Sequence, residues 1–439
     1  MRYLCCCLLL CGTLSAAEET REDKVRADRR KVEAEGFWIY NDLPKAFEQA
    51  QQQDKPLMVV LRCIPCEECV KLDDELIDND EELRPLLEQF VRARQVSTNG
   101  LDLDIFQYDT DQSFAVFFLN ADGTIYGRFG TRSHRTEWVG DVSVRGLEQA
   151  MKKVLQLHED FDTVKASLAG KKGEPLEVAS PEKYPALKGK YTDALNYKGN
   201  VVQSCIHCHQ IGDAQREWYL SQGKPIPEKI FYPHPHPRSV GLTLDPKTIA
   251  TIQAVEPESP AAAAGLRAGD ALETMNGQPL VSTADVQWVL HNVDPDGGSV
   301  SLQVSRAGDT FQTSLNLEDG WRRESDISWR VTSWPYRRMV TGGMLLHEAD
   351  EELRDELNIP DGKMALKVSH LGRYGKHATA RRTGFQEDDV IVSYDGQTDL
   401  LTDSDLLYYA MKNRNVGEKV EIEFIRDGRR RSLKLPMQD

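Results

Sequence analysis

The stretch PLMVVLRCIPCEECVKLDDELI, residues 56–77, places three cysteines directly after a run of apolar residues. The run 56–62 predicts a buried strand, and the residues from Cys69 onward predict a helix. Cys63, Cys66 and Cys69 therefore gather at a junction between a strand and a helix. A thiol at a helix N-terminus is stabilised as the reactive thiolate by the helix dipole and by free backbone N–H groups. The stretch thus predicts a thiol redox site.

Residues 37–161 around this junction predict a mixed sheet with flanking helices. Helices are expected at 46–55 and 143–161, a strand at 90–97, and a strand hairpin over 114–130 that turns at Ala121-Asp122-Gly123. This order resembles the thioredoxin-like fold, with Arg62-Cys63-Ile64-Pro65-Cys66 at the place of that fold's active-site motif. One position departs from the resemblance, because Phe114 stands where thioredoxins carry a cis-proline.

The thioredoxin resemblance assigns roles to the three thiols. Cys63 is expected to attack a disulfide of a redox partner protein, and Cys66 is expected to resolve the mixed disulfide. Cys69 lies three residues after Cys66 and shares its helix face, so it offers a second resolving thiol. Alternatively, the three thiolates bind zinc or copper(I), or two of them form a structural disulfide beside a buried thiol.

A second motif, Cys205-Ile206-His207-Cys208-His209, has the form of a c-type haem attachment site. Two thiols at this spacing can add to the two vinyl groups of haem c, and the following imidazole then reaches the iron. Cys205 and Cys208 are therefore expected to attach the haem, and His209 is the expected metal ligand. His207 is expected to be exposed.

A six-coordinate haem iron needs a second axial ligand. His234 and His236, in the proline-rich stretch 223–239, are the expected candidates, and Met275 is a further one. The prolines of this stretch exclude a regular helix or a central strand. The alternatives to haem are a zinc ion, bound by the motif and one of these two histidines, or a disulfide in a loop.

An internal repeat occupies the C-terminal half of the chain. AGLRAGDALETMNGQPL (264–280) matches TGFQEDDVIVSYDGQTDL (383–400), and each copy continues with a helical pattern and a strand pair that turns at Gly308 or Gly428. The repeats resemble PDZ domains of the bacterial, protease-associated kind. The chain contains neither a GxSxG nor a GNSGG stretch, so serine protease activity is not expected.

The PDZ resemblance implies binding of protein partners through C-terminal peptides, which add a strand beside a groove-lining helix. Gly241-Leu242-Thr243-Leu244 stands at the carboxylate-binding loop of the first copy, and 282–293 is its groove helix. Gly342-Gly343-Met344-Leu345 stands in roughly that place in the second copy, where an insertion follows. The alternative is that both repeats serve only as scaffolding.

The first 17 residues have the order of a secretory signal: one basic residue, an apolar run, then small residues. The expected protein is periplasmic or secreted, or anchored by an uncleaved signal, and no later stretch is apolar enough to span a membrane. The net charge of −16 argues against binding nucleic acid.

The whole order resembles an exported bacterial family of thioredoxin-like/PDZ proteins, some of which carry selenocysteine. The predicted fold class is multidomain α/β and α+β, a thioredoxin-like mixed sheet followed by two PDZ-like, partly open β-barrels. The predicted division is a signal peptide (1–17), a charged leader (18–36), the thioredoxin-like domain (37–161), a linker (162–195), the CxxCH segment (196–238), a PDZ-like domain (239–320), a linker (321–338) and a second PDZ-like domain (339–439).

The leading functional hypothesis is an exported thiol–disulfide oxidoreductase. Its cysteines exchange disulfides, a single haem c transfers electrons, and the PDZ-like domains bind the partner. The alternative is a non-catalytic PDZ scaffold whose cysteine clusters are structural or bind metal.

Overall fold

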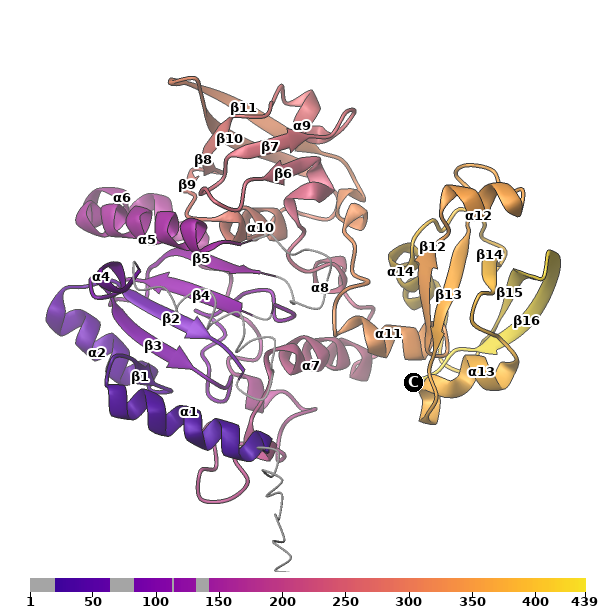
Figure 1. Cartoon of the computed structure of the whole chain (residues 1–439), viewed down its shortest axis with the longest axis horizontal. Coiled ribbons are helices and arrows are strands. Elements are labelled where there is room, and N and C mark those ends of the chain that lie inside the picture. Colours follow the sequence, from indigo (N-terminus) through magenta and orange to yellow (C-terminus); the bar gives the residue numbers. More distant parts are fainter. Residues whose placement is uncertain (1–19, 64–82, 113, 132–141) are drawn as a thin grey trace, which may run out of the picture.

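The computed structural model describes residues 20–63, 83–112, 114–131 and 142–439, and Figure 1 shows the arrangement of the chain. The predicted signal peptide, the helix expected from Cys69 onward, and the thiols of Cys66 and Cys69 lie outside the described residues. Within the described part, no helix combines the length and the apolar character that crossing a membrane requires.

The N-terminal domain is built on a five-stranded sheet with the order β1-β3-β2-β4-β5. Its strands are β1 (Ile39–Tyr40), β2 (Leu57–Leu61), β3 (Val91–Gln95), β4 (Phe114–Leu119) and β5 (Ile125–Thr131). The pairs β1–β3 and β2–β3 are parallel, whereas β2–β4 and β4–β5 are antiparallel. This mixed sheet confirms the predicted thioredoxin-like fold.

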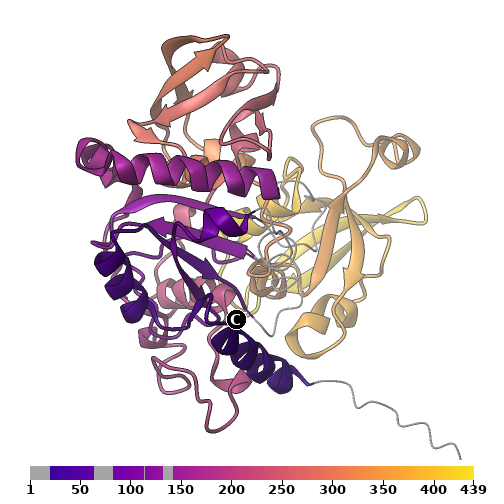
Figure 2. The ribbon, with the colours of Figure 1, turned by 60° about the vertical axis from the view of Figure 1, so that its left-hand side comes forward.

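Helices cover both faces of this sheet, and every residue of β2 is buried. The covering helices include α2 (Leu43–Gln53) and α5 (Val144–Glu159); the short helix α4 (Arg84–Leu87) precedes β3. Met58 and Val60 pack into the apolar cluster that contains α5, whereas Val59 packs with Ala46 and Ala50 of α2. A strand buried on both faces is apolar throughout, which explains the continuous apolar run in the sequence. Figure 2 shows α5 lying across the sheet.

The charged residues 18–36, expected to be a leader or an exposed helix, contain helix α1 (Arg21–Glu35). The helix packs on the domain, because Val32 is buried in the cluster that also holds α5. Glu22 accepts a hydrogen bond from the backbone N–H of Val201 at 2.9 Å. The segment is therefore part of the folded domain.

Residues 162–195 are not the plain linker that their glycine, proline and lysine content predicted. Helix α6 (Phe161–Leu168) opens the segment, and short 3-10 turns follow. Tyr184 and Leu187 in these turns are buried in a cluster with Ile206. Helix α7 (Cys208–Ser221) and the one-turn helix α8 (Glu228–Phe231) come next, and a 3-10 turn begins at Pro237, so the proline-rich stretch contains only short helical turns.

The first repeat forms a PDZ-like domain with two small sheets, β6-β7 and β11-β10-β8-β9. Its elements are β6 (Leu242–Leu244), β7 (Ile252–Val255), α9 (Pro260–Ala263), β8 (Ala271–Met275), β9 (Gln278–Pro279), α10 (Thr283–His291), β10 (Gly298–Arg306) and β11 (Asp309–Leu317). The predicted groove helix and the strand pair turning at Gly308 are both present. In Figure 1 helix α10 lies between this domain and β5.

Helix α10 joins the first PDZ-like domain to the thioredoxin-like domain through buried polar contacts. The Asp285 carboxylate accepts hydrogen bonds from the backbone N–H of Arg128 on β5 at 3.1 Å and from Lys171 Nζ at 2.6 Å. The side chains of Lys171 and Asp285 are each 1% exposed. The indole of Trp288 also donates to the Gly170 carbonyl oxygen at 2.9 Å. These contacts hold the two domains together.

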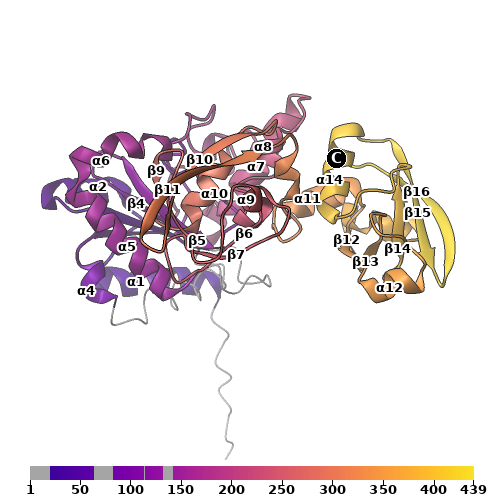
Figure 3. The same ribbon diagram turned by 90° about the horizontal axis from the view of Figure 1, so that it is seen from above.

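The second repeat forms a separate PDZ-like domain around a five-stranded sheet of order β12-β13-β14-β15-β16. Its elements are β12 (Met344–Glu348), α12 (Glu351–Glu356), β13 (Leu366–Leu371), α13 (Thr379–Thr383), β14 (Val390–Tyr394), α14 (Asp403–Asn413), β15 (Lys419–Arg426) and β16 (Arg429–Pro436). Figure 3 shows this domain beside the rest of the molecule and joined to it near α11 (Ser333–Val340).

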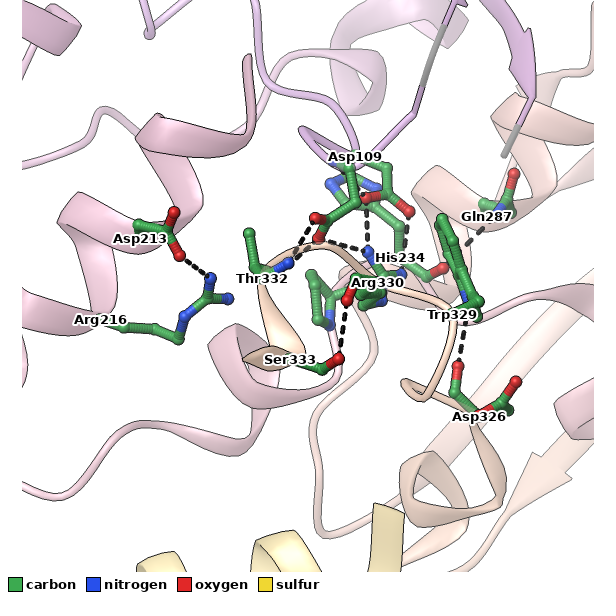
Figure 4. Close-up of polar contacts among 12 residues, drawn as sticks. Asp109, Asp213, Arg216, His234, Gln287, Asp326, Trp329, Arg330, Thr332 and Ser333 are labelled. Carbon is green, nitrogen blue, oxygen red and sulfur yellow. Dashed lines mark hydrogen bonds and ion pairs between the residues drawn. The ribbon is translucent and has the colours of Figure 1, made fainter. Parts of the chain in front are cut away.

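The predicted linker 321–338 is partly buried, and α11 crosses its predicted C-terminal boundary. Arg330 contacts Asp109 with two hydrogen bonds of 2.5 and 2.9 Å, and it reaches Asp111 at 3.2 Å. Thr332 also donates to Asp111 through its hydroxyl, at 2.6 Å. Figure 4 shows Arg330 beside the Asp109 carboxylate. The segment between the repeats is thus anchored to the thioredoxin-like domain.

Candidate functional site

The candidate site forms where β2 and β3 end and the CxxCH segment crosses the sheet edge. Cys63 follows β2 directly. The backbone N–H and hydroxyl of Thr98, after β3, donate to the Ile206 carbonyl oxygen at 3.2 and 2.9 Å. The backbone N–H of Ile206 donates to Asn99 Oδ1 at 2.8 Å, and Asn99 Nδ2 donates to the Ser204 carbonyl oxygen at 3.0 Å. These bonds hold the CxxCH loop beside Cys63.

The sequence predicts the two cysteine motifs as separate sites, but the fold brings them together here. Cys63 Sγ lies 2.8 Å from His207 Nδ1 although the residues are 144 positions apart. The donor atoms of Cys63, Cys205 and His207 all lie within 4.8 Å of one another. Cys63 and Cys205 are 7% and 5% exposed, and neither is in a disulfide. The expectation that His207 is simply exposed is therefore wrong.

The surroundings of this group shift the pKa values of two of its members, Cys205 and His207. Hydrogen bonding from Cys63, joined by a hydrogen bond from Ser97, lowers the pKa of Cys205 although burial opposes it. Burial lowers the pKa of His207, and the nearby charges of His209 and Arg21 act in the same direction. A neutral imidazole can accept a proton from a neighbouring thiol, so the site pairs a base with two sulfur atoms.

Cys63, Cys205 and His207 are also the residues that could hold a metal ion. Across the described residues, they are the one group of three or more Cys, His, Asp or Glu side chains whose donor atoms gather this closely. Two thiolates and an imidazole suit zinc or copper(I). The set differs from both predicted metal sets, since it takes one cysteine from each motif.

The arrangement does not fit a c-type haem. Attachment would require Cys205 and Cys208 to face one macrocycle, but Cys205 is buried beside Cys63 and the Val96 carbonyl oxygen. Cys208 begins helix α7 and packs against the apolar cluster that contains α2. A porphyrin could reach Cys205 only if the CxxCH loop left the end of β3. Haem therefore stays a prediction of the sequence.

His209 lies outside the close group formed by Cys63, Cys205 and His207. Its side chain is 40% exposed, and its Nδ1 lies 3.5 Å from the Asp213 carboxylate one helical turn later. Asp213 in turn accepts a hydrogen bond from Arg216 at 2.9 Å, as Figure 4 shows. The ring of His209 also lies parallel to that of His207, with the centroids 5.9 Å apart.

His234 and His236, the expected distal ligands, have structural contacts. The His234 ring stacks on His291 of α10 with centroids 4.0 Å apart, and the His234 carbonyl oxygen accepts a hydrogen bond from Gln287 at 3.3 Å. His236 accepts a hydrogen bond from the Arg238 N–H at 3.4 Å, at the start of a 3-10 turn. Both histidines thus help to pack the first PDZ-like domain.

The predicted peptide site of the first PDZ-like domain is present but partly covered. Gly241 has the left-handed φ of 81° that ends a 3-10 turn, and Leu242, Thr243 and Leu244 form β6, which pairs with β7. Helix α10 is buried from Ala284 through Leu290. One side of α10 contacts β5, and His234 lies on Gln287 and His291. The rest of the chain therefore covers the helix of this groove.

The second PDZ-like domain has a cavity of 530 Å³ between β12, α14 and the preceding segment. Leu346, His347 and Glu348 of the edge strand β12 form one wall. Asp405 at the start of α14 and Asp326 lie on the other sides. Burial, followed by the charges of Asp405 and Asp326, raises the pKa of Glu348. The cavity is therefore acidic.

Two family models match this chain, each over one domain. A thioredoxin-like model matches residues 38–121, and a PDZ domain model matches residues 238–317. Together with the fold, they define a protein with a thioredoxin-like domain followed by PDZ domains.

Among curated proteins, the chain is similar to periplasmic serine endoproteases. A "Probable periplasmic serine endoprotease DegP-like" of Marinomonas sp. (strain MWYL1) is 29% identical over 35% of this chain and 30% of that protein. The "Periplasmic pH-dependent serine endoprotease DegQ" of Escherichia coli (strain K12) is 26% identical over 34% and 29%. The chain thus spans about 30% of the length of these relatives.

Similar solved structures include the serine endoprotease from Yersinia pestis, 18% identical over 26% of this chain and 36% of that chain, with a TM-score of 0.20. Another is the HtrA3 PDZ domain bound to a phage-derived ligand, 27% identical over 18% of this chain and 78% of that chain, with a TM-score of 0.15.

Proposed function

We propose that this chain is an exported thiol–disulfide redox protein in which Cys63 exchanges disulfides with partner proteins. The observation that carries the proposal is the 2.8 Å contact between Cys63 Sγ and His207 Nδ1. Relatives whose names place them in the periplasm support export. Disulfides form and persist in that compartment.

His207 is the base in this proposal. Burial lowers the pKa of His207, so the imidazole is neutral at pH 7 and its Nδ1 can accept the Cys63 proton. The thiolate formed in this way is the nucleophile of disulfide exchange. A cysteine that only fills space in a core has no need of a titratable partner at hydrogen-bond distance.

The rate at which iodoacetamide alkylates Cys63 in the full chain tests the role of His207. Peptide mapping assigns the modified cysteine at each time point. His207→Ala is expected to lower the rate constant for Cys63 at pH 7 by about tenfold, because the thiolate fraction falls. It is also expected to move the pH profile to higher pH.

The matched control is His209→Ala, which removes the neighbouring exposed histidine and should change the rate by less than about twofold. Equal rates in the His207→Ala variant and the unchanged protein would remove the support for the redox function. If Cys63 reacts no faster than a model thiol, the alternative of a PDZ scaffold with structural or metal-binding cysteines is correct.

We further propose that a partner protein binds as an extended peptide at the second PDZ domain. The acidic cavity beside the edge strand β12 supports this, since an added strand would pair with β12 and place side chains in the cavity. A peptide with lysine or arginine would offset the charges of Glu348, Asp405 and Asp326. Helix α10 of the first PDZ domain is buried, which disfavours peptide binding in that domain.

Fluorescence anisotropy with labelled peptides tests this site. A Lys-rich peptide is expected to bind more tightly than its Glu-substituted counterpart, and salt should weaken the binding. Glu348→Gln should reduce the preference for lysine, whereas Glu273→Gln, in the first PDZ domain, should not. Equal binding of both peptides would contradict the acidic site.

A further inference from the structure

Cys205 lies beside the nucleophile of the proposed exchange reaction. Its sulfur is within 4.8 Å of Cys63 Sγ, and a hydrogen bond joins the two thiols. The sequence motif would instead pair Cys63 with Cys66, and Cys205 with Cys208. The placement of Cys205 therefore points to a different disulfide, between Cys63 and Cys205, which are 142 residues apart in the sequence.

We propose that Cys205 is the resolving thiol of this protein, so that its redox-active disulfide joins Cys63 to Cys205. The inference rests on the proposed redox function and specifies its second step. The disulfide would link the end of β2 in the thioredoxin-like domain to the CxxCH loop.

Hydrogen bonds to the residues on both sides of Cys205 hold its loop next to Cys63. Asn99 accepts the N–H of Ile206, directly after Cys205, at 2.8 Å and donates to the carbonyl oxygen of Ser204, directly before it, at 3.0 Å. A disulfide requires a sulfur–sulfur distance of about 2.05 Å, so the two thiols need to approach by at most about 3 Å. Side-chain rotation and a small loop shift supply such a displacement.

The surroundings of Cys205 suit a resolving thiol. Cys63 and Cys205 are 7% and 5% exposed, so exposure does not rank them, and the first attack is assigned to Cys63 from its place just after β2. Cys205 Sγ lies 3.9 Å from the Val96 carbonyl oxygen, just after β3. Cys208, in contrast, begins α7 and lies outside the close group formed by Cys63, Cys205 and His207.

The exchange then proceeds in two balanced steps. His207 takes the Cys63 proton, the Cys63 thiolate attacks a partner disulfide, and one partner sulfur leaves as a thiolate that His207 can protonate. Cys205 then gives its proton to His207, which is neutral again, and its thiolate attacks Cys63 Sγ in the mixed disulfide; the second partner sulfur leaves and takes that proton from His207. Two electrons pass from the Cys63–Cys205 pair to the partner disulfide, and the reverse sequence oxidises a partner dithiol.

Glutathione disulfide serves as the partner in the test, with the full chain in its reduced form. The Cys205→Ser variant is expected to accumulate a glutathione adduct on Cys63 that lasts at least about tenfold longer than in the unchanged protein. Cys208→Ser is the matched control and should resolve the adduct normally. Peptide mapping of the oxidised, unchanged protein should yield a Cys63–Cys205 linked peptide, a measurement that needs no variant.

Other outcomes overturn the inference. A Cys63–Cys66 or Cys205–Cys208 link in the unchanged protein would do so, as would an adduct that persists equally in all variants. A zinc or copper ion that protects both thiols until a chelator removes it would assign the group to metal binding. If no adduct forms on Cys63 in any variant, the proposed redox function itself fails, whereas adduct formation with the wrong link leaves that function intact.

Discussion

The buried histidines of this protein serve different purposes, which their contacts define. His207 faces a thiol at hydrogen-bond distance, whereas His234 and His291 face each other between domains. A neutral ring can accept a proton in the first setting. In the second, protonation would place a positive charge in a buried site that already lies near other cations.

Acidification is expected to destabilise the fold through His234 and His291. Burial holds the pKa of both rings well below the ordinary value of 6.5, and the charges of Arg330, Lys229 and Arg322 add to this at both rings. In the unfolded chain each ring takes up a proton near pH 6.5, so unfolding binds protons below that pH. Stability is therefore full above about pH 6.5 and falls with pH by up to about 1.4 kcal/mol per unit for each ring.

Urea unfolding between pH 7.5 and pH 5 measures this slope. His291→Gln removes one titrating ring and should reduce the slope by up to about 1.4 kcal/mol per pH unit. The comparison variant is Ser299→Ala on β10, which removes no titrating group and should leave the slope unchanged. A slope that is the same in the His291→Gln variant would show that the stacked pair does not titrate on unfolding.

At the scale of elements, the contact between β5 and α10 decides where the first PDZ domain sits. Gly127 of β5 permits this contact, since a Cβ atom there would lie 2.6 Å from Val281 Cβ and 2.8 Å from Asp285 Oδ2. Val281 is fully buried, and Asp285 is held by a buried ion pair with Lys171 and by the N–H of Val281, so these neighbours have little room to shift.

Gly127→Ala is therefore expected to destabilise the protein by about 1 to 3 kcal/mol, the usual cost of overpacking a filled site. Because the clash falls at the domain junction, limited proteolysis should cut between the thioredoxin-like and first PDZ domains sooner than in the unchanged protein. Ser299→Ala, on the exposed hairpin of the same PDZ domain, is the control. Unchanged stability and cleavage in the Gly127→Ala variant would mean that the junction is loosely packed.

The sequence predicted the elements well because their signals are local. The run 56–62 became β2, and 282–293 contains α10. The site could not be predicted in the same way, since the contact between Cys63 and His207 depends on how distant segments pack. The nearest signal in the sequence is His207, which lies between Cys205 and Cys208. The haem motif uses the two cysteines and His209, so it assigned no role to His207. The linker at 162–195 was mispredicted because Tyr184 and Leu187 are buried despite a polar composition.

At the scale of the whole molecule, a buried ion cluster connects three regions. Arg330, from the segment between the PDZ domains, contacts Asp109 and Asp111 of the thioredoxin-like domain. It also donates to the Pro233 carbonyl oxygen, which precedes His234, at 2.6 Å. The side chain of Arg330 is 5% exposed, and both carboxylates are 2% exposed. The segment that leads into the second PDZ domain is thereby attached to the thioredoxin-like domain.

Arg330→Met is expected to lower the free energy of unfolding by about 3 to 5 kcal/mol, because Asp109 and Asp111 lose their buried counter-charge. Chemical denaturation measures the loss, and Arg431→Met, at an exposed ion pair, should cost less than about 1 kcal/mol. Replacing both carboxylates by leucine in the Arg330→Met background should recover much of the loss, since an apolar cluster can replace a buried ion triad. If Arg330→Met alone leaves stability unchanged, the cluster does not hold the domains together, and the segment joins them only as a tether.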